Sequence, residues 1–317
     1  MQYYLLILIA VILLALQFST NKAYSLRCGS SAKASLRFTA LSGFASALVS
    51  LILAFAAGEG FRITPYSAVM AAIVAVLCCT YTFVGFKIMA LGPMSVFTMF
   101  LMLGGMLLPY LFGVFFLDEG VSVWRILGVI LLTASMAFPV LAREKSGTNH
   151  SRRAFVLFFL LCAAVFVLNG FVSITSKLHQ INEVYARSGS ASFSFLSNAL
   201  NALISGAGLL IISAKEKSSA SADDVSASEK AVHGAEKVRL GGITLIILAN
   251  AVCGGVSYML QLVSAGKVAA SVLYPMITGG SMVLSALAAF LFFKEKPDKI
   301  SLAGLALSFA ATFLFLF

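Results

Sequence analysis

The segment FLDEGVSVWRILGVILLTASM, residues 116–136, recurs in altered form as FFKEKPDKISLAGLALSFAAT, residues 292–312. When residues 92–136 are laid on residues 268–312 without a gap, 11 of 45 positions are identical, whereas usage frequencies predict about 4 by chance. Two identities are polar pairs, Glu119 with Glu295 and Ser95 with Ser271. The alternative, two helical pairs that look alike because both are apolar, does not explain those pairs. The pattern therefore predicts an internal repeat.

The composition places most of the chain in lipid. The 317 residues are 60% hydrophobic and 11% charged, and the mean hydropathy is +1.00. A soluble domain cannot hide so much apolar surface. A soluble enzyme, a secreted disulfide scaffold and a disordered tail are thereby excluded. The net charge of +10 comes from basic residues in short loops between apolar runs, which is typical of membrane proteins and predicts no nucleic-acid partner.

Ten apolar runs are long enough, or nearly so, to cross a bilayer. Lipid offers the backbone no hydrogen-bond partners, so each run is predicted to be a helix. The predicted spans are Tyr3–Phe18 (continuing to about Ala23), Ala34–Ala57, Ser67–Met89, Pro93–Leu117, Val121–Leu141, Ala154–Ile174, Ala191–Ser213, Leu240–Ser264, Val268–Phe293 and Ile300–Phe317.

The repeat divides these spans into two units of five. Residues 1–142 form the predicted first unit and residues 143–153 a connecting loop; residues 154–317 form the second unit, with a polar loop at 214–239. An odd number of crossings inserts the second unit upside down. The predicted fold is thus all-α and integral to the membrane, with ten transmembrane helices as two inverted five-helix repeats, an arrangement that places a substrate site near the midplane in transporters.

Two segments carry a family resemblance: FFLDEGVSVWRILGVILLTASMAF (115–138) and FFKEKPDKISLAGLALSFAATFLF (292–315). Each contains Phe-x-x-Glu and then a glycine nine residues beyond the glutamate, Gly128 or Gly304. They resemble the paired signatures of EamA-type proteins of the drug/metabolite transporter superfamily, and LRFTAL (36–41) resembles the start of that family's second helix. The resemblance implies ten helices around a central cavity and transport of small metabolites by export or exchange. The loop AGEGFRITPY (57–66) departs from the family, since its only basic residue is Arg62.

The basic residues predict an orientation in the plasma membrane. Loops 1–2, 3–4, 5–6, 7–8 and 9–10, with their flanks, hold 17 of the 22 Lys and Arg residues. By the positive-inside rule these loops are cytoplasmic and both termini lie outside. The family more often keeps its termini inside, and that alternative stays open.

Neutral polar residues within the apolar runs are the candidate substrate site. They should face inward, because amides and hydroxyls have no partners in lipid; helix–helix hydrogen bonds are the competing explanation. The candidates are Gln17, Asn21, Tyr81, Ser95, Asn169, Asn201, Asn250, Tyr258, Gln261, Ser271, Tyr274 and Thr278. Lys22 and Arg37 form a candidate charged rim that attracts an anionic substrate group, with snorkelling to headgroups as the alternative.

The functional prediction is a carrier for a small polar or zwitterionic metabolite, working by alternating access. All twelve carboxylates fall in loops or helix ends, which argues against proton exchange for a cationic drug at a midplane carboxylate. No HExxH or GxSxG motif is present and no histidine falls in an apolar run, so we predict no enzyme activity, catalytic residue, metal site or cofactor. The alternatives are a lipid or lipid-linked-metabolite flippase of the same fold and a structural or partner-binding protein. The expected partners are the substrate and the bilayer. A homodimer is compatible with the sequence.

Overall fold

The computed structural model describes residues 2–29, 31–56, 58, 60–91, 94–143, 152–219, 236–294 and 299–317. This part of the chain forms helices and contains no strand. The helices are α1 (Gln2–Cys28), α2 (Ala32–Ala56), α3 (Pro65–Leu91), α4 (Met94–Phe116), α5 (Val123–Arg143), α6 (Arg152–Ile181), α7 (Ser190–Ser219), α9 (Glu236–Ala265), α10 (Ala270–Phe293) and α11 (Lys299–Phe313), followed by the 3₁₀ turn η1 (Leu314–Leu316).

Seven of the described helices are long and apolar enough to cross a membrane. They are α1, α2, α3, α6, α7, α9 and α10, while the described apolar parts of α4, α5 and α11 are shorter. Large apolar side chains lie on the outside of the bundle, among them Phe44, Phe55 and Leu210. Such a surface is unfavourable in water and suits lipid. The protein is therefore an all-α, multi-pass membrane protein.

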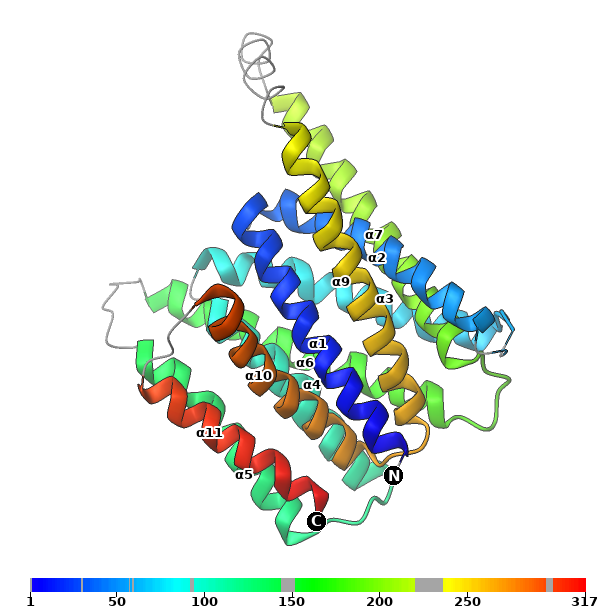
Figure 1. Cartoon of the computed structure of the whole chain (residues 1–317), viewed down its shortest axis with the longest axis vertical. Helices are drawn as coiled ribbons and strands as arrows, with labels where there is room; N and C mark the ends of the chain where they lie inside the picture. The colour runs from blue at the N-terminus through cyan, green and yellow to red at the C-terminus, as the bar shows by residue number, and fades with distance from the viewer. Residues whose placement is uncertain are drawn as a thin grey trace.

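The helices pack in a bundle in which sequence neighbours are often not spatial neighbours. α1 lies against α9 and α10, and α6 lies against α3 and α4. α2 lies against α7 and α9, and α7 also contacts α3; α4 contacts α10, and α5 pairs with α11 at one side (Figure 1). Both chain termini lie at the same end of the bundle (Figure 1).

Glycines allow two of these crossings to be very close. A Cβ added at Gly104 of α4 would lie 1.9 Å from the carbonyl oxygen of Phe166 in α6. A Cβ added at Gly280 of α10 would lie 2.8 Å from Cγ1 of Val11 in α1. Backbones can approach this closely only where one partner lacks a side chain, which is the usual means of helix association in lipid.

Four helices extend beyond the apolar runs that predicted them. α1 continues past Ala23 to Cys28. The predicted polar loop 214–239 is helical at both ends, because α7 extends to Ser219 and α9 begins at Glu236. Residues 220–235 fall outside the described residues. α6 continues past Ile174 to Ile181. The prediction that no histidine falls in an apolar run is therefore wrong for His179, which lies inside a long apolar helix. Lys, Glu, Ala and Gln are good helix formers, so a helix need not end where hydrophobicity ends.

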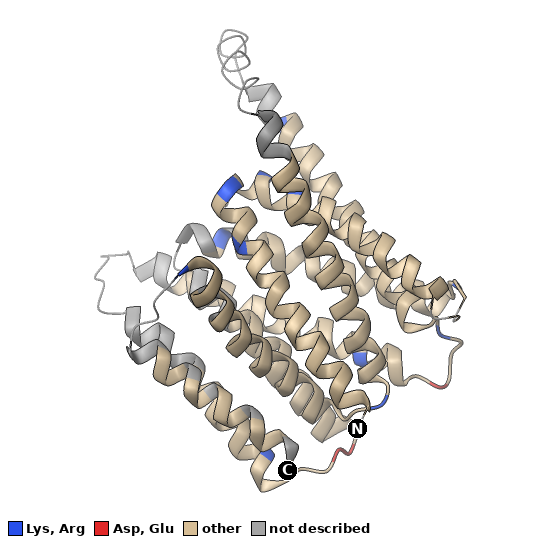
Figure 2. Cartoon of the chain, viewed as in Figure 1, with Lys and Arg blue, Asp and Glu red and all other residues tan. Residues whose placement is uncertain are grey.

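The charged residues are segregated along the bundle. Figure 2 shows the Lys and Arg ribbons gathered mainly at the end opposite the two termini, whereas the Asp and Glu ribbons lie in loops at the end of the termini. Arg27, Lys33 and Arg37 belong to the first set, around the turn between α1 and α2, and Asp118 and Glu119 belong to the second. We refer below to the basic end and the terminal end.

Candidate functional site

A cavity of about 530 Å³ lies in the middle of the bundle. Its described lining comes from eight helices, α1, α2, α3, α4, α6, α7, α9 and α10. It reaches from Gly29, which is exposed in the turn between α1 and α2, to Ala265, which is buried at the last position of α9. The cavity is thus accessible at the basic end and covered at the terminal end.

Most of the residues predicted from the sequence meet in this cavity. Ten line it: Gln17, Asn21, Tyr81, Asn169, Asn201, Asn250, Tyr258, Gln261, Tyr274 and Thr278. Ser271 does not, because it lies in the first turn of α10 with its hydroxyl buried against the terminal end. Ser95 belongs to α4, and its side chain falls outside the described part.

The two residues of the predicted charged rim do not line the cavity. The Lys22 ammonium lies 4.9 Å from the centroid of the Phe293 ring, at the end of α10, a cation–π contact. Arg37 is exposed on α2. The side chains of both residues therefore lie away from the described lining, and neither provides a charge inside the site.

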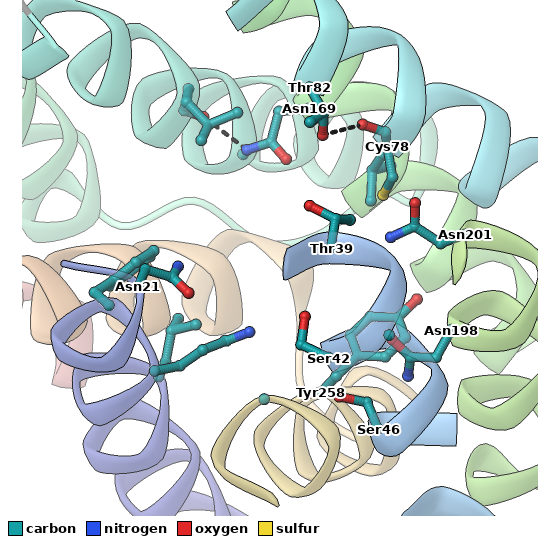
Figure 3. Close-up of a pocket in the computed structure, with 18 of the residues that line it drawn as sticks. Asn21, Thr39, Ser42, Ser46, Cys78, Thr82, Asn169, Asn198, Asn201 and Tyr258 are labelled. Atoms are coloured by element: carbon teal, nitrogen blue, oxygen red, sulfur yellow. Dashed lines mark hydrogen bonds between the residues drawn. The ribbon is translucent and has the colours of Figure 1, made fainter. Parts of the chain in front are cut away.

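Asn250 of α9 ties the cavity wall to α1. Its Nδ2 group donates to the Oδ1 atom of Asn21 at 2.6 Å, to Oγ1 of Thr20 at 2.8 Å and to the carbonyl oxygen of Gln17 at 3.2 Å. Asn250 is only 3% exposed, so these bonds satisfy an amide that lipid could not. Asn21 itself lines the cavity (Figure 3), and its Nδ2 group makes no hydrogen bond with another described residue.

Asn169 of α6 plays a similar part on the opposite wall. Its Nδ2 group donates to the carbonyl oxygen of Leu101 in α4 at 2.7 Å (Figure 3). Gly105 makes room for it, since a Cβ there would lie 2.6 Å from Nδ2. Because the donor group is used by α4, the Oδ1 atom is the part of the amide that remains for a ligand.

Two tyrosines lie in the deep part of the cavity, near the terminal end. The Tyr274 hydroxyl donates to the carbonyl oxygen of Ser173 at 2.7 Å, and the Tyr258 hydroxyl lies 3.0 Å from Oγ of Ser176. Pro275 follows Tyr274 directly, and α10 continues through that proline. The two contacts join α10 and α9 to α6 beneath the cavity.

The sequence prediction missed the α2 wall. Ser35, Thr39, Ser42 and Ser46 all line the cavity, and Figure 3 shows the last three beside Tyr258 and Asn198. The 4-3-4 spacing of these hydroxyl residues marks one helix face, so the signal was present in the sequence. It was missed because Ser and Thr are small and common in membrane helices. Asn198 of α7 is also part of the lining.

Charged groups cover the terminal end of the cavity. The buried Lys177 of α6 donates to the carbonyl oxygens of Ala265 at 2.8 Å and Val268 at 2.6 Å. The Glu119 carboxylate accepts the backbone N–H groups of Ala270 at 2.6 Å and Ser271 at 2.7 Å, the first residues of α10. A cation at a helix C-terminus and an anion at a helix N-terminus are both favourable, so the turn between α9 and α10 is held from two sides.

A second network closes the same end between α3, α6 and α7. His179 is fully buried, with its Nε2 atom 2.7 Å from Oγ of Ser67 and its Nδ1 atom 3.1 Å from Nε2 of Gln180. Its ring stacks on Phe193 with the centroids 3.8 Å apart. Both ring nitrogens have protein partners, so this histidine holds helices together and does not reach the cavity lining.

Comparison with known proteins supports the fold alone. No family model and no curated protein sequence matches the chain. A solved structure, described only as the crystal structure of a protein, resembles it with a TM-score of 0.73 and 16% sequence identity. The match covers 99% of this chain and 96% of the other. The whole helical arrangement is therefore one that a crystallised protein also adopts.

Proposed function

We propose that this protein is a carrier that moves a small polar or zwitterionic metabolite across the cytoplasmic membrane by alternating access. The observation that carries the proposal is the cavity itself, rich in amides and hydroxyls, accessible at Gly29 and covered at Ala265. A polar cavity within lipid is costly unless it serves a ligand. Access from one end at a time is what a carrier needs to avoid becoming a channel.

The helix packing supports an inverted repeat of five plus five helices. The proposed units equate α1 with α6, α2 with α7, α3 with α9, α4 with α10 and α5 with α11. Exchanging the partners preserves the most extensive helix contacts: α1 on α9 becomes α6 on α3, and α4 on α6 becomes α10 on α1. The pairs α2 with α7, α4 with α10 and α5 with α11 map onto themselves, as expected of elements beside a two-fold axis.

Local geometry supports the same repeat at the offset of 176 residues. Gly104 and Gly280 are one matched pair, and they occupy the equivalent crossings of α4 with α6 and of α10 with α1. Asp118 and Lys294 are another such pair. Among the described non-glycine residues only these two have a positive φ, 49° and 54°. Each of these residues precedes a glutamate, so the backbone has the same left-handed conformation just after α4 and just after α10.

We infer from these features that the chain is an EamA-type member of the drug/metabolite transporter superfamily. The sequence signature at residues 115–138 and 292–315 and the ten described helices agree with that assignment. The amide- and hydroxyl-rich lining favours a water-soluble substrate over the lipid substrate of a flippase. The basic end faces the cytoplasm in this proposal, so the described state takes up substrate from inside, as export or exchange requires.

Flux measurements test the proposal. The purified chain in proteoliposomes should exchange internal for external radiolabelled solute in a screen of amino acids, sugars, nucleosides and amines. The double variant Asn21→Ala with Asn169→Ala should lose most of the flux, because it removes an amide from each of two facing walls. Asn182→Ala is the control, since Asn182 lies in the loop after α6 and does not line the cavity. Flux that the double variant leaves unchanged would contradict the site, and absence of flux for every solute would contradict the function.

A further inference from the structure

The described lining of the cavity presents no charge to a ligand. Among the described residues that line it there is no Asp, Glu, Lys, Arg or His. The nearest ionic groups at the terminal end, Lys177 and Glu119, are already bonded to the α9–α10 turn. A ligand with a net charge would leave water for a site in lipid without a counter-charge, which is strongly unfavourable.

The described hydroxyl protons around the cavity are largely used by the protein. Thr39 donates to the carbonyl oxygen of Ser35 at 2.9 Å and Ser42 to that of Phe38 at 2.7 Å. The other cavity-lining hydroxyls that donate to a backbone carbonyl are Tyr24, Ser46, Thr82, Ser197, Tyr274 and Ser281. A hydroxyl that donates to the backbone keeps its lone pairs, so each of these groups can only accept from a ligand without breaking its existing bond.

Three amides add acceptors of the same kind. The donor groups of Asn169, Asn198 and Gln261 point to Leu101 O, to Ser194 O and Oγ, and to Ser257 Oγ respectively. Their carbonyl oxygens accept no hydrogen bond from the described residues. The opposite case is that of Asn21 and Asn201. Their Oδ1 atoms accept from Asn250 and from the Cys79 thiol respectively, and their Nδ2 groups are left as donors. Acceptors therefore outnumber donors on the described walls.

We propose that the substrate of this cavity is an uncharged solute rich in O–H donors, of the size of a sugar or a nucleoside. This inference rests on the proposed carrier function and narrows it. Hydroxyl groups of the substrate donate to the amide oxygens of Asn169, Asn198 and Gln261 and accept from Asn21. The rings of Tyr81, Tyr258 and Tyr274, which line the same space, pack against the faces of a sugar or base. An anion would find few free donors and no counter-charge on the described walls, and a zwitterion would have to bury two charges without a charged partner.

Solutes that are similar in shape but differ in charge show whether the cavity selects against charge. Binding of glucose, gluconate and glucosamine, and of uridine and its 5′-monophosphate, is measured by calorimetry on the full chain in nanodiscs. We expect at least one uncharged member to bind ten or more times more tightly than its charged partners. Asn21→Asp keeps the oxygen that accepts from Asn250 and places a carboxylate in the cavity. This variant should bind glucosamine more tightly than glucose. Asn182→Asp, which lies outside the cavity, should leave the order of the two affinities unchanged.

The outcomes test the substrate class and the carrier function separately. Equal or tighter binding of the charged partners, or binding and exchange confined to amino acids, would overturn the substrate class and leave the carrier function standing. An Asn21→Asp protein that folds but keeps the original preference would also overturn it, since the substrate then avoids that wall. If no solute of any class binds or is exchanged, the proposed function itself fails.

Discussion

Glu119 and Ala270 are joined by a hydrogen bond of 2.6 Å from the first backbone N–H of α10 to the carboxylate of the α4–α5 loop. The same carboxylate takes the N–H of Ser271 at 2.7 Å, so one side chain satisfies two of the four donors that a helix start leaves open. Gly113 permits the contact, because a Cβ there would lie 2.5 Å from Oε2 of Glu119. The α4–α5 loop thereby holds the first turn of a helix that lines the cavity.

Glu119→Ala should loosen the terminal end of the cavity. A hydrogen bond to a charged group contributes about 1.5–3 kcal/mol, so amide exchange at Ala270 and Ser271 should accelerate by at least about tenfold. Hydrogen exchange with mass spectrometry on the detergent-solubilised protein measures this directly. Asp118→Asn is the control, because Asp118 is exposed and Asn tolerates its positive φ of 49°. Unchanged exchange at α10 in the Glu119 variant would mean that the cap does not hold the helix.

Glu295 is the counterpart of Glu119 in the proposed repeat and lies outside the described residues. If the units exchange roles during transport, it caps the start of α4 when the basic end closes. Glu295→Ala should then favour the state described here, whereas Glu119→Ala should favour the opposite state. Labelling of Cys28, beside the mouth of the cavity and partly exposed, with a thiol reagent should rise in the first variant and fall in the second. A change in the same direction in both variants would contradict the exchange.

Lys177→Met should reduce stability. The ammonium group is buried and donates to two backbone carbonyls at the end of α9, and methionine would fill the space without satisfying either. We expect a loss of about 2 kcal/mol or more in the free energy of unfolding, read as a lower Tm in detergent. Lys267→Met, on the exposed neighbouring turn, should change the Tm little. Equal effects of the two substitutions would show that the buried bonds contribute nothing specific.

Gly104→Ala should separate α4 from α6. The added Cβ would meet the backbone oxygen of Phe166 at 1.9 Å, and a backbone atom cannot rotate away as a side chain can. Overpacking of this kind costs about 1–3 kcal/mol, so thermal unfolding should begin at lower temperature. Gly206→Ala in α7 is the matched control, because nothing lies within 4 Å of its added Cβ; alanine is the better helix former there. A Gly104 variant as stable as the Gly206 variant would refute the close crossing.

A reporter fused after Phe317 tests the orientation. If the basic end is cytoplasmic, the terminal end lies outside, because both termini lie at that end (Figure 1). Alkaline phosphatase at this position should be active and a fluorescent protein dark when the chain is produced in bacteria. A second reporter inserted after Gly29 should give the reverse pattern. The opposite pair of signals would turn the cavity mouth to the outside and change export into uptake.

Residue types and their spacing along the chain were enough to predict the lipid environment, the helical spans and ten of the residues that line the cavity. Hydrophobic runs report the solvent directly, and an amide such as Asn169 in such a run has to face inward because lipid gives it no partner. That argument could not separate lining residues from buried contacts elsewhere. Ser271 obeys the same rule as Thr278, yet it lies at the first turn of α10 beside Glu119.

The covered end of the cavity, and the contacts that cover it, could be identified from the packing of the helices but not from the residue pattern. Lys177, counted in the sequence as a loop charge, lies within α6 and reaches the end of α9, 88 residues away along the chain. His179 likewise belongs to α6 and is buried between α3 and α7. Hydrophobicity measures the transfer of each residue from water, one at a time. A buried charge is stabilised by partners distant in sequence, and only folding brings those partners together.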